Sequence, residues 1–225
     1  MATTTIFISH SKRDQELIGV IGYNFRQIDV TPILEEYSPE SSPPYEKIDR
    51  DIASSSAVFV FLTQNAKITD YTQNWINYEI TKAHDLQKPT FVIEDVNNLV
   101  HFPIPKLSNY ILYDPTKVED WKLLQKLANK IKESLKSNAP LVGLLIGATA
   151  GALVSKKDKL AGALIGSILG GIFGSLVSSS PSSEQLKAPY QLKCANCGIV
   201  FNLFTNTFIK TLQCPSCRTG LYLTD

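Results

Sequence analysis

The sequence predicts an α/β fold in which a parallel sheet, covered by helices, is followed by two smaller parts. Three observations lead to this prediction. Short apolar runs alternate with segments of helical periodicity over residues 1–136. Glycine then recurs at every fourth position of two apolar runs within residues 139–178, and all four cysteines lie between residues 194 and 217. The 225-residue chain therefore divides into one large domain and two short C-terminal parts.

The N-terminal elements follow from local composition. Residues 4–9 (TTIFIS) form a run of apolar and β-branched side chains, which predicts a buried strand. Residues 13–27 repeat apolar side chains every three to four positions, so a helix is expected next. Residues 30–34 predict a second strand, whose Pro32 suits a less central position. Residues 35–45 contain three prolines and predict a long polar loop.

The remaining elements of the first domain follow the same alternation. Residues 47–54 predict a short helix, and residues 58–62 (VFVFL) are typical of a central strand that is covered on both faces. Residues 74–87 contain neither proline nor glycine and predict a helix. Two more strands and a closing helix are expected at residues 90–93, 110–113 and 118–135. Such alternation builds a parallel sheet, whose ligands bind beyond the carboxyl ends of the strands.

One acidic residue is placed to act at that edge. Trp75 and Glu79 lie four residues apart, so their side chains share a face of the helix predicted at 74–87. Residues 9–11 end the first strand at the same edge of the predicted sheet. A lone carboxylate on a helix is usually solvated. Spacing alone leaves Glu79 as either a surface residue or an acid that acts in a cleft.

A resemblance to a known family makes the second alternative specific. Residues 6–11 (IFISHS), followed by Asp14, resemble the first box of Toll/interleukin-1 receptor (TIR) domains. Residues 52–62 are similar to the family's segment that leads into its third strand, and Trp75-x-x-x-Glu79 matches the motif of the family's enzymatic branch. The resemblance extends over the first domain in the family's order. It implies a flavodoxin-like, five-stranded parallel sheet.

The resemblance also implies an activity, the cleavage of NAD+ between nicotinamide and ribose by an NAD+ glycohydrolase. Nicotinamide leaves as a neutral molecule, so the reaction needs no general acid, and one carboxylate can stabilise the oxocarbenium-like transition state. By position, Glu79 would be catalytic and Trp75 would form a wall of the pocket. The other residues implied to bind the substrate are Phe7, His10, Ser11 and Asp14. Whether the product is ADP-ribose or a cyclic isomer stays open.

A non-enzymatic interpretation also remains. The family's Arg-Asp…Pro-Gly signature is absent from residues 35–45, where residues 37–40 (YSPE) and the prolines at 43 and 44 stand instead. The domain could then be a protein-interaction and signalling module, with Glu79 solvated. In that case Phe7 would be a core residue, and His10 and Ser11 would cap the following helix. The order of the three parts otherwise suggests an immune or stress effector, for example in antiviral defence, that is activated by oligomerisation.

Residues 139–178 are predicted to form a hairpin of two glycine-zipper helices. Glycine at every fourth position lines one helical face and permits close helix packing, whereas in water it weakens a helix. We therefore expect self-association and a transmembrane hairpin, although the apolar runs 141–154 and 160–177 are short for a membrane span. The alternative is a soluble cytoplasmic oligomer that buries its glycine faces. NAD+ and free thiols favour the cytoplasmic face of the membrane for the other two parts.

A linker at residues 179–188 precedes a predicted zinc ribbon at residues 189–225. The two Cys-x-x-Cys pairs have the spacing of a structural four-thiolate zinc site, formed by Cys194, Cys197, Cys214 and Cys217. A hairpin is expected between the pairs, from residues 199–204 and 207–212. So small a module needs the metal for its stability. A redox dithiol is the alternative, and nucleic-acid binding is disfavoured because few basic residues surround the cysteines.

Overall fold

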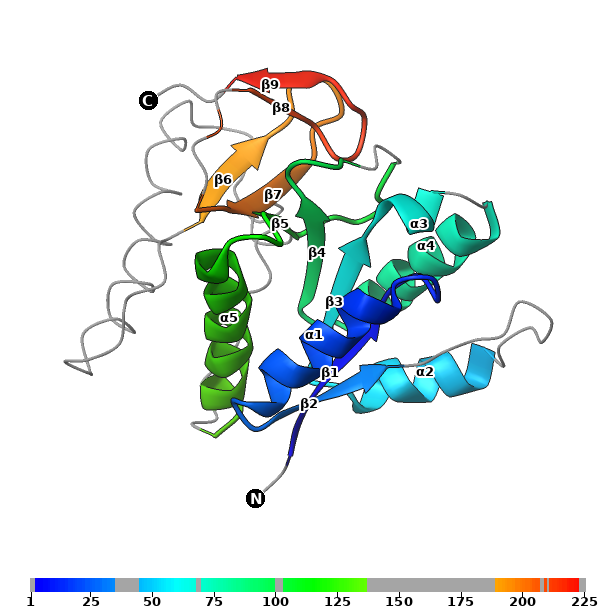
Figure 1. Ribbon diagram of the computed structural model, residues 1–225. Helices are drawn as coiled ribbons and strands as arrows, with labels where there is room; N and C mark the ends of the chain where they lie inside the picture. Colours follow the sequence, from blue (N-terminus) through cyan, green and yellow to red (C-terminus); the bar gives the residue numbers. More distant parts are fainter. Residues whose placement is uncertain are drawn as a thin grey trace.

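The computed structural model describes residues 3–34, 45–67, 70–99, 103–136, 189–206, 209 and 211–222. Over these residues the larger sheet has seven strands in the order β2-β1-β3-β4-β5-β7-β6, and only β6 is antiparallel to its neighbour (Figure 1). The strands are β1 (Thr4–Ser9), β2 (Val30–Leu34), β3 (Ala57–Leu62), β4 (Thr90–Asp95), β5 (Asn109–Tyr113), β6 (Tyr190–Lys193) and β7 (Val200–Phe204). The α/β class and the parallel sheet are confirmed.

Helices cover both faces of this sheet, with α1 and α5 on one face and α2 and α4 on the other (Figure 1). The helices are α1 (Gln15–Arg26), α2 (Tyr45–Ser54), α3 (Gln64–Lys67), α4 (Asp70–Asp85) and α5 (Val118–Lys136). Phe59 and Phe61 enter the core beneath α1 and α5, whereas Val58 and Val60 enter the opposite core. This double burial explains why β3 is apolar throughout.

The strand count and one pairing differ from the prediction. A five-stranded sheet was expected, but β7 adds to β5 in parallel and β6 follows it, which makes seven strands in the described part of the chain. The predicted hairpin of residues 199–204 with 207–212 is wrong, because β7 pairs with β5 and β6 while β8 (Thr211–Gln213) pairs with β9 (Gly220–Tyr222). The reason lies in β7 itself, whose apolar side chains need cover on both faces.

Several predictions fall on other parts of the chain. The glycine-zipper hairpin at 139–178, the linker at 179–188 and most of the loop at 35–45 lie outside the described residues. Within the described ranges, no helix combines the length and the apolar character needed to cross a membrane.

Candidate functional site

The carboxyl ends of β1 and β3 lie side by side at one edge of the sheet, because the two strands are parallel neighbours. The strand that follows β1 in the chain, β2, lies on one side of β1. The next strands, β3 and β4, are added in order on its other side. Ligands of open α/β sheets bind outside the carboxyl ends of the strands, where the direction of strand addition reverses. Residues at this edge are therefore the first candidates for a functional site.

Glu79 is a buried carboxyl group at this edge. Only 5% of its surface is exposed, and it shares the inner side of α4 with the buried Ile76, Ile80 and Ala83. Burial raises the pKa of Glu79 to about 7, and the neighbouring Ser9 hydroxyl acts in the opposite direction. No cation among the described residues offsets the charge of this carboxylate. A buried acid without a countercharge is costly to keep, which makes it a candidate for function.

Ser9 is the last residue of β1, and 2% of its surface is exposed. Its hydroxyl group faces the Glu79 carboxyl group, yet Ser9 Oγ makes no hydrogen bond of normal geometry with the described residues. Two polar side chains are thus buried together, and the hydroxyl of one is unsatisfied, an arrangement that calls for an explanation in a native structure. The sequence interpretation named the adjacent His10 and Ser11 as site residues but not Ser9, because the position of α4 over β1 is not visible in a local pattern.

Asp14 ties together the segments that leave β1 and β3. Its Oδ2 accepts a hydrogen bond of 2.7 Å from the Thr63 hydroxyl, and its Oδ1 accepts one of 2.6 Å from the Asn65 amide. Both carboxylate oxygens are therefore engaged within the chain, at the start of α1 on one side and of α3 on the other. Asp14, which the resemblance implies to bind the substrate, lies after the carboxyl end of β1 and holds two loops together.

The other first-box residues build the connection between β1 and α1. Phe7 is buried in the core beneath α2 and α4. The Ser11 hydroxyl accepts a hydrogen bond of 3.4 Å from the Arg13 backbone N–H, and the Ser11 carbonyl accepts one of 2.9 Å from the Asp14 N–H. The Nδ1 atom of His10 lies 3.1 Å from the same carbonyl oxygen. Ser11 and His10 thus shape the turn beside Ser9, whereas Phe7 faces away from solvent.

Trp75 packs against α2. Its ring centroid lies 4.6 Å from that of Tyr45 and 5.7 Å from that of Tyr78. The Tyr78 hydroxyl donates a 2.6 Å hydrogen bond to Asp49, which also forms a 2.6 Å ion pair with Lys82. Burial and the hydrogen bond to Asp49 raise the pKa of Tyr78 to about 12. The Trp75 side chain therefore belongs to an aromatic cluster between two helices, while the acid of the same motif faces β1.

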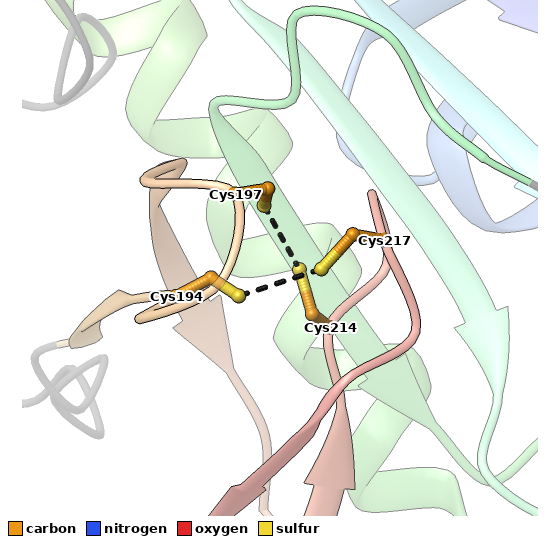
Figure 2. A group of neighbouring side chains, drawn as sticks. All are labelled: Cys194, Cys197, Cys214 and Cys217. Carbon is orange, nitrogen blue, oxygen red and sulfur yellow. Dashed lines mark hydrogen bonds between the residues drawn. The ribbon is translucent and has the colours of Figure 1, made fainter.

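A second candidate site lies at the other end of the sheet, where the four cysteines come together (Figure 2). All four Sγ atoms lie within 4.8 Å of one another. The Cys194–Cys217 and Cys197–Cys214 sulfur pairs are 3.5 and 3.8 Å apart. Tetrahedral zinc with metal–sulfur bonds of about 2.3 Å requires sulfurs roughly 3.8 Å apart. The cluster thus fits a thiophilic metal ion such as Zn²⁺.

The two Cys-x-x-Cys pairs have equivalent backbones. The Gly198 N–H donates to the Cys194 carbonyl at 2.9 Å, and the Arg218 N–H donates to the Cys214 carbonyl at 2.8 Å. The fourth residue after each leading cysteine has a left-handed backbone, with φ of 75° at Gly198 and 66° at Arg218. The same turn therefore occurs twice, and each turn presents two thiols to the shared centre.

Polar groups outside the four ligands favour ionisation of Cys217, whereas burial raises the pKa of the Cys214 thiol to about 12. The Thr219 hydroxyl and the Asn196 amide each lie 3.4 Å from Cys217 Sγ. These contacts lower the pKa of the Cys217 thiol. Metal ligation requires thiolates, so neighbours that favour the ionised sulfur also favour metal binding.

Comparison with known proteins bears on the central part of the chain. A family model described as a glycine zipper matches residues 141–184, in agreement with the zipper predicted at 139–178. No curated protein matches the chain.

Proposed function

We propose that the α/β domain is a TIR-type NAD+ glycohydrolase in which Glu79 is the catalytic carboxylate. The main observation in support is the burial of Glu79 beside Ser9 at the carboxyl edge of β1 and β3. The order β2-β1-β3-β4-β5 is that of flavodoxin-like sheets, which agrees with the resemblance of residues 4–136 to TIR domains. In such sheets the reversal between β1 and β3 is the ligand-binding crevice.

The chemistry suits a single buried acid. When the bond between nicotinamide and ribose breaks, its electron pair goes to the pyridinium nitrogen, and neutral nicotinamide leaves. Positive charge then develops on the ribose, and the Glu79 carboxylate stabilises it in a site of low dielectric constant. With a pKa of about 7, a substantial fraction of Glu79 is ionised at neutral pH, and the Ser9 hydroxyl favours that form. Attack by water releases ADP-ribose and a proton, whereas attack by a hydroxyl or adenine nitrogen of the substrate gives a cyclic isomer.

The test is to incubate the full-length protein with NAD+ and to separate nicotinamide and ADP-ribose by chromatography. Glu79→Gln keeps the size of the side chain and removes its charge, so we expect at least about a 100-fold loss of turnover. Glu16→Gln is the matched control, because Glu16 is an exposed glutamate in the first turn of α1. Equal turnover in the wild type and the Glu79 variant would overturn the proposal.

The C-terminal cysteines, in this proposal, form a zinc ribbon with a structural Zn²⁺ ion. The residues that would hold the ion are Cys194, Cys197, Cys214 and Cys217. The sulfur separations and the repeated turn support a closed site without an open coordination position. Zinc content measured by mass spectrometry tests this, with one ion per chain expected and less than a stoichiometric amount in Cys214→Ser.

The glycine-zipper segment is proposed to bring copies of the chain together at the cytoplasmic face of a membrane, or in a soluble cytoplasmic oligomer. The support is the family match at 141–184 and the four-residue glycine spacing, which permits helices to pack closely. Replacing Gly162 and Gly166 with leucine should reduce self-association, as measured by cross-linking. Fractionation with and without detergent separates the membrane-bound from the soluble alternative.

A second candidate function is that of a non-enzymatic interaction module. The engagement of both Asp14 oxygens and the burial of Phe7 favour it, because these two side chains already serve the fold. The NAD+ assay also decides between the two functions, since an interaction module leaves the nucleotide intact.

A further inference from the structure

The C-terminal strands are built into the sheet of the first domain. β7 pairs in parallel with β5, and Asn109 and Asn202 lie opposite each other in the register. The Asn202 amide donates a 3.0 Å hydrogen bond to Asn109 Oδ1, and the Asn109 amide donates one of 3.0 Å to the Thr90 carbonyl. Both amides are buried, so a chain of hydrogen bonds runs across three strands in the interior. This chain fixes the register of β7 on the sheet.

The hydrophobic cores also cross the boundary between the two parts. Phe204 contacts Phe91 edge to face, with ring centroids 6.1 Å apart, in the core beneath α1 and α5. Phe201 contacts Tyr110 in the same manner at 6.2 Å in the opposite core, which Leu212 of β8 also enters. The described residues between 189 and 222 therefore share both cores of the first domain.

Polar contacts fasten the C-terminal segment to the first turn of α5 and to the segment that precedes β5. The Asn206 amide donates hydrogen bonds of 2.8 Å to Asp120 Oδ1 and 3.2 Å to the Glu119 carbonyl, in the first turn of α5. The Ile104 N–H donates to the Pro215 carbonyl at 3.3 Å, within the second cysteine turn. The segment is thus attached through both cysteine-bearing hairpins.

The hairpins themselves are short. β6 has four residues and lies at the sheet edge, and β8 and β9 have three residues each. An isolated two-stranded hairpin as short as that of β8 and β9 has little stability in water. Cys194 directly follows β6 and Cys214 directly follows β8, so an ion held by both cysteine pairs would join the hairpin of β6 and β7 to that of β8 and β9 (Figure 2).

We propose that metal binding by the four cysteines clasps residues 189–222 onto the α/β domain, so that metal occupancy sets the stability of the whole domain, including its candidate active site. The ion would be of the thiophilic kind that takes four thiolates, such as Zn²⁺. An ion that binds the folded but not the unfolded chain stabilises everything that folds with its site. The proposal does not depend on cleavage of NAD+.

The experiment compares the full-length protein loaded with zinc and the same protein after chelation, by thermal unfolding and by hydrogen exchange. Zinc should raise the midpoint of a single unfolding transition by more than about 5 °C. It should also slow exchange of the backbone amides of β5 (Asn109–Tyr113). If zinc binds while the midpoint and the exchange of β5 stay the same, the C-terminal segment is an independent module and the proposal is wrong.

Two variants sharpen the result. Cys217→Ser should behave like the chelated wild type and should no longer respond to zinc, whereas Ser216→Ala, in the same turn, should respond fully. Asn109→Ala leaves the cysteines intact but removes the buried joint between β4, β5 and β7. It should still bind one zinc ion, and the effect of zinc on exchange in β5 should shrink at least twofold. Undiminished coupling in Asn109→Ala would show that the stabilisation does not pass through the sheet.

Discussion

The hydroxyl group of Ser9 faces the carboxyl group of Glu79 across the gap between β1 and α4, and both side chains are almost completely buried. The two residues are 70 positions apart in the sequence, and the fold alone brings them together. Their pairing is the reason to treat this edge of the sheet as a functional site. It also makes the protonation of Glu79 measurable through stability as well as through activity.

Glu79→Gln should change how stability depends on pH. The unfolded chain ionises Glu79 near pH 4.5, whereas the folded protein keeps its proton up to about pH 7. The unfolded state therefore binds fewer protons in this range, and the wild type loses stability as pH rises from 4.5 through 7. The difference amounts to about 3 kcal/mol above pH 7. In denaturant unfolding, the free energy of unfolding of Glu79→Gln should not show this loss as pH rises from 4.5 through 7.

The control for this measurement is Glu16→Gln, which removes an exposed carboxylate and should leave the pH dependence of the wild type unchanged. The prediction is wrong if the unfolding free energies of the wild type and of Glu79→Gln depend on pH in the same way between about pH 5 and pH 8. Glu79 would then ionise at the ordinary pKa of a glutamate.

Ser9→Ala should raise the pKa of Glu79. The Ser9 hydroxyl lowers the pKa of Glu79, so its removal leaves only the effect of burial. If the carboxylate is the active form, the acidic limb of the pH–rate profile for NAD+ cleavage should move to higher pH. Ser55→Ala is a matched control, because Ser55 is also 2% exposed but precedes the amino end of β3, at the opposite edge of the sheet. If the pH–rate profiles of Ser9→Ala and Ser55→Ala are identical, Ser9 does not affect the ionisation of the catalytic carboxylate.

The elements of the first domain could be predicted because their signals are local. Alternating burial on two faces makes β3 apolar throughout, and the apolar repeat of α5 marks one buried stripe. The helix that carries Glu79 was expected from residue 74, but α4 begins at Asp70, since side-chain composition leaves the start of a helix loosely defined. The four cysteines were also a local signal, and they meet as their spacing predicts.

What could not be predicted depends on partners that are distant in the chain. The composition of β7 indicates a strand, but not that β5 would be its neighbour. Trp75 was expected to form a pocket wall with Glu79, and the structure adds that its ring packs against Tyr45 of α2, which no helical spacing relates to it. The roles of Thr63 and Asn65 as partners of Asp14 likewise require the parallel arrangement of β1 and β3.

Asp14→Ala should destabilise the protein by roughly 2 kcal/mol, because the Thr63 hydroxyl and the Asn65 amide both lose their acceptor. The measurement is the free energy of unfolding from denaturant titration. Asp85→Ala is the control, since the Asp85 side chain is 59% exposed and its ion pair with Lys106 lies at the surface, where such pairs contribute little. If the two variants lose equal stability, the hydrogen bonds of Asp14 are not holding the two loops.

Gly198→Ala should weaken the metal site without touching a ligand. Gly198 has a φ of 75°, and a side chain in this left-handed conformation costs roughly 1–2 kcal/mol, although open space surrounds the position where a Cβ would lie. Gly220→Ala is matched to it, because that glycine also has open space around it but no left-handed backbone. In a competition against a chromophoric chelator, zinc affinity should fall about tenfold for the first variant and stay near the wild-type value for the second. Equal affinities would show that the first turn can form with an ordinary backbone at residue 198.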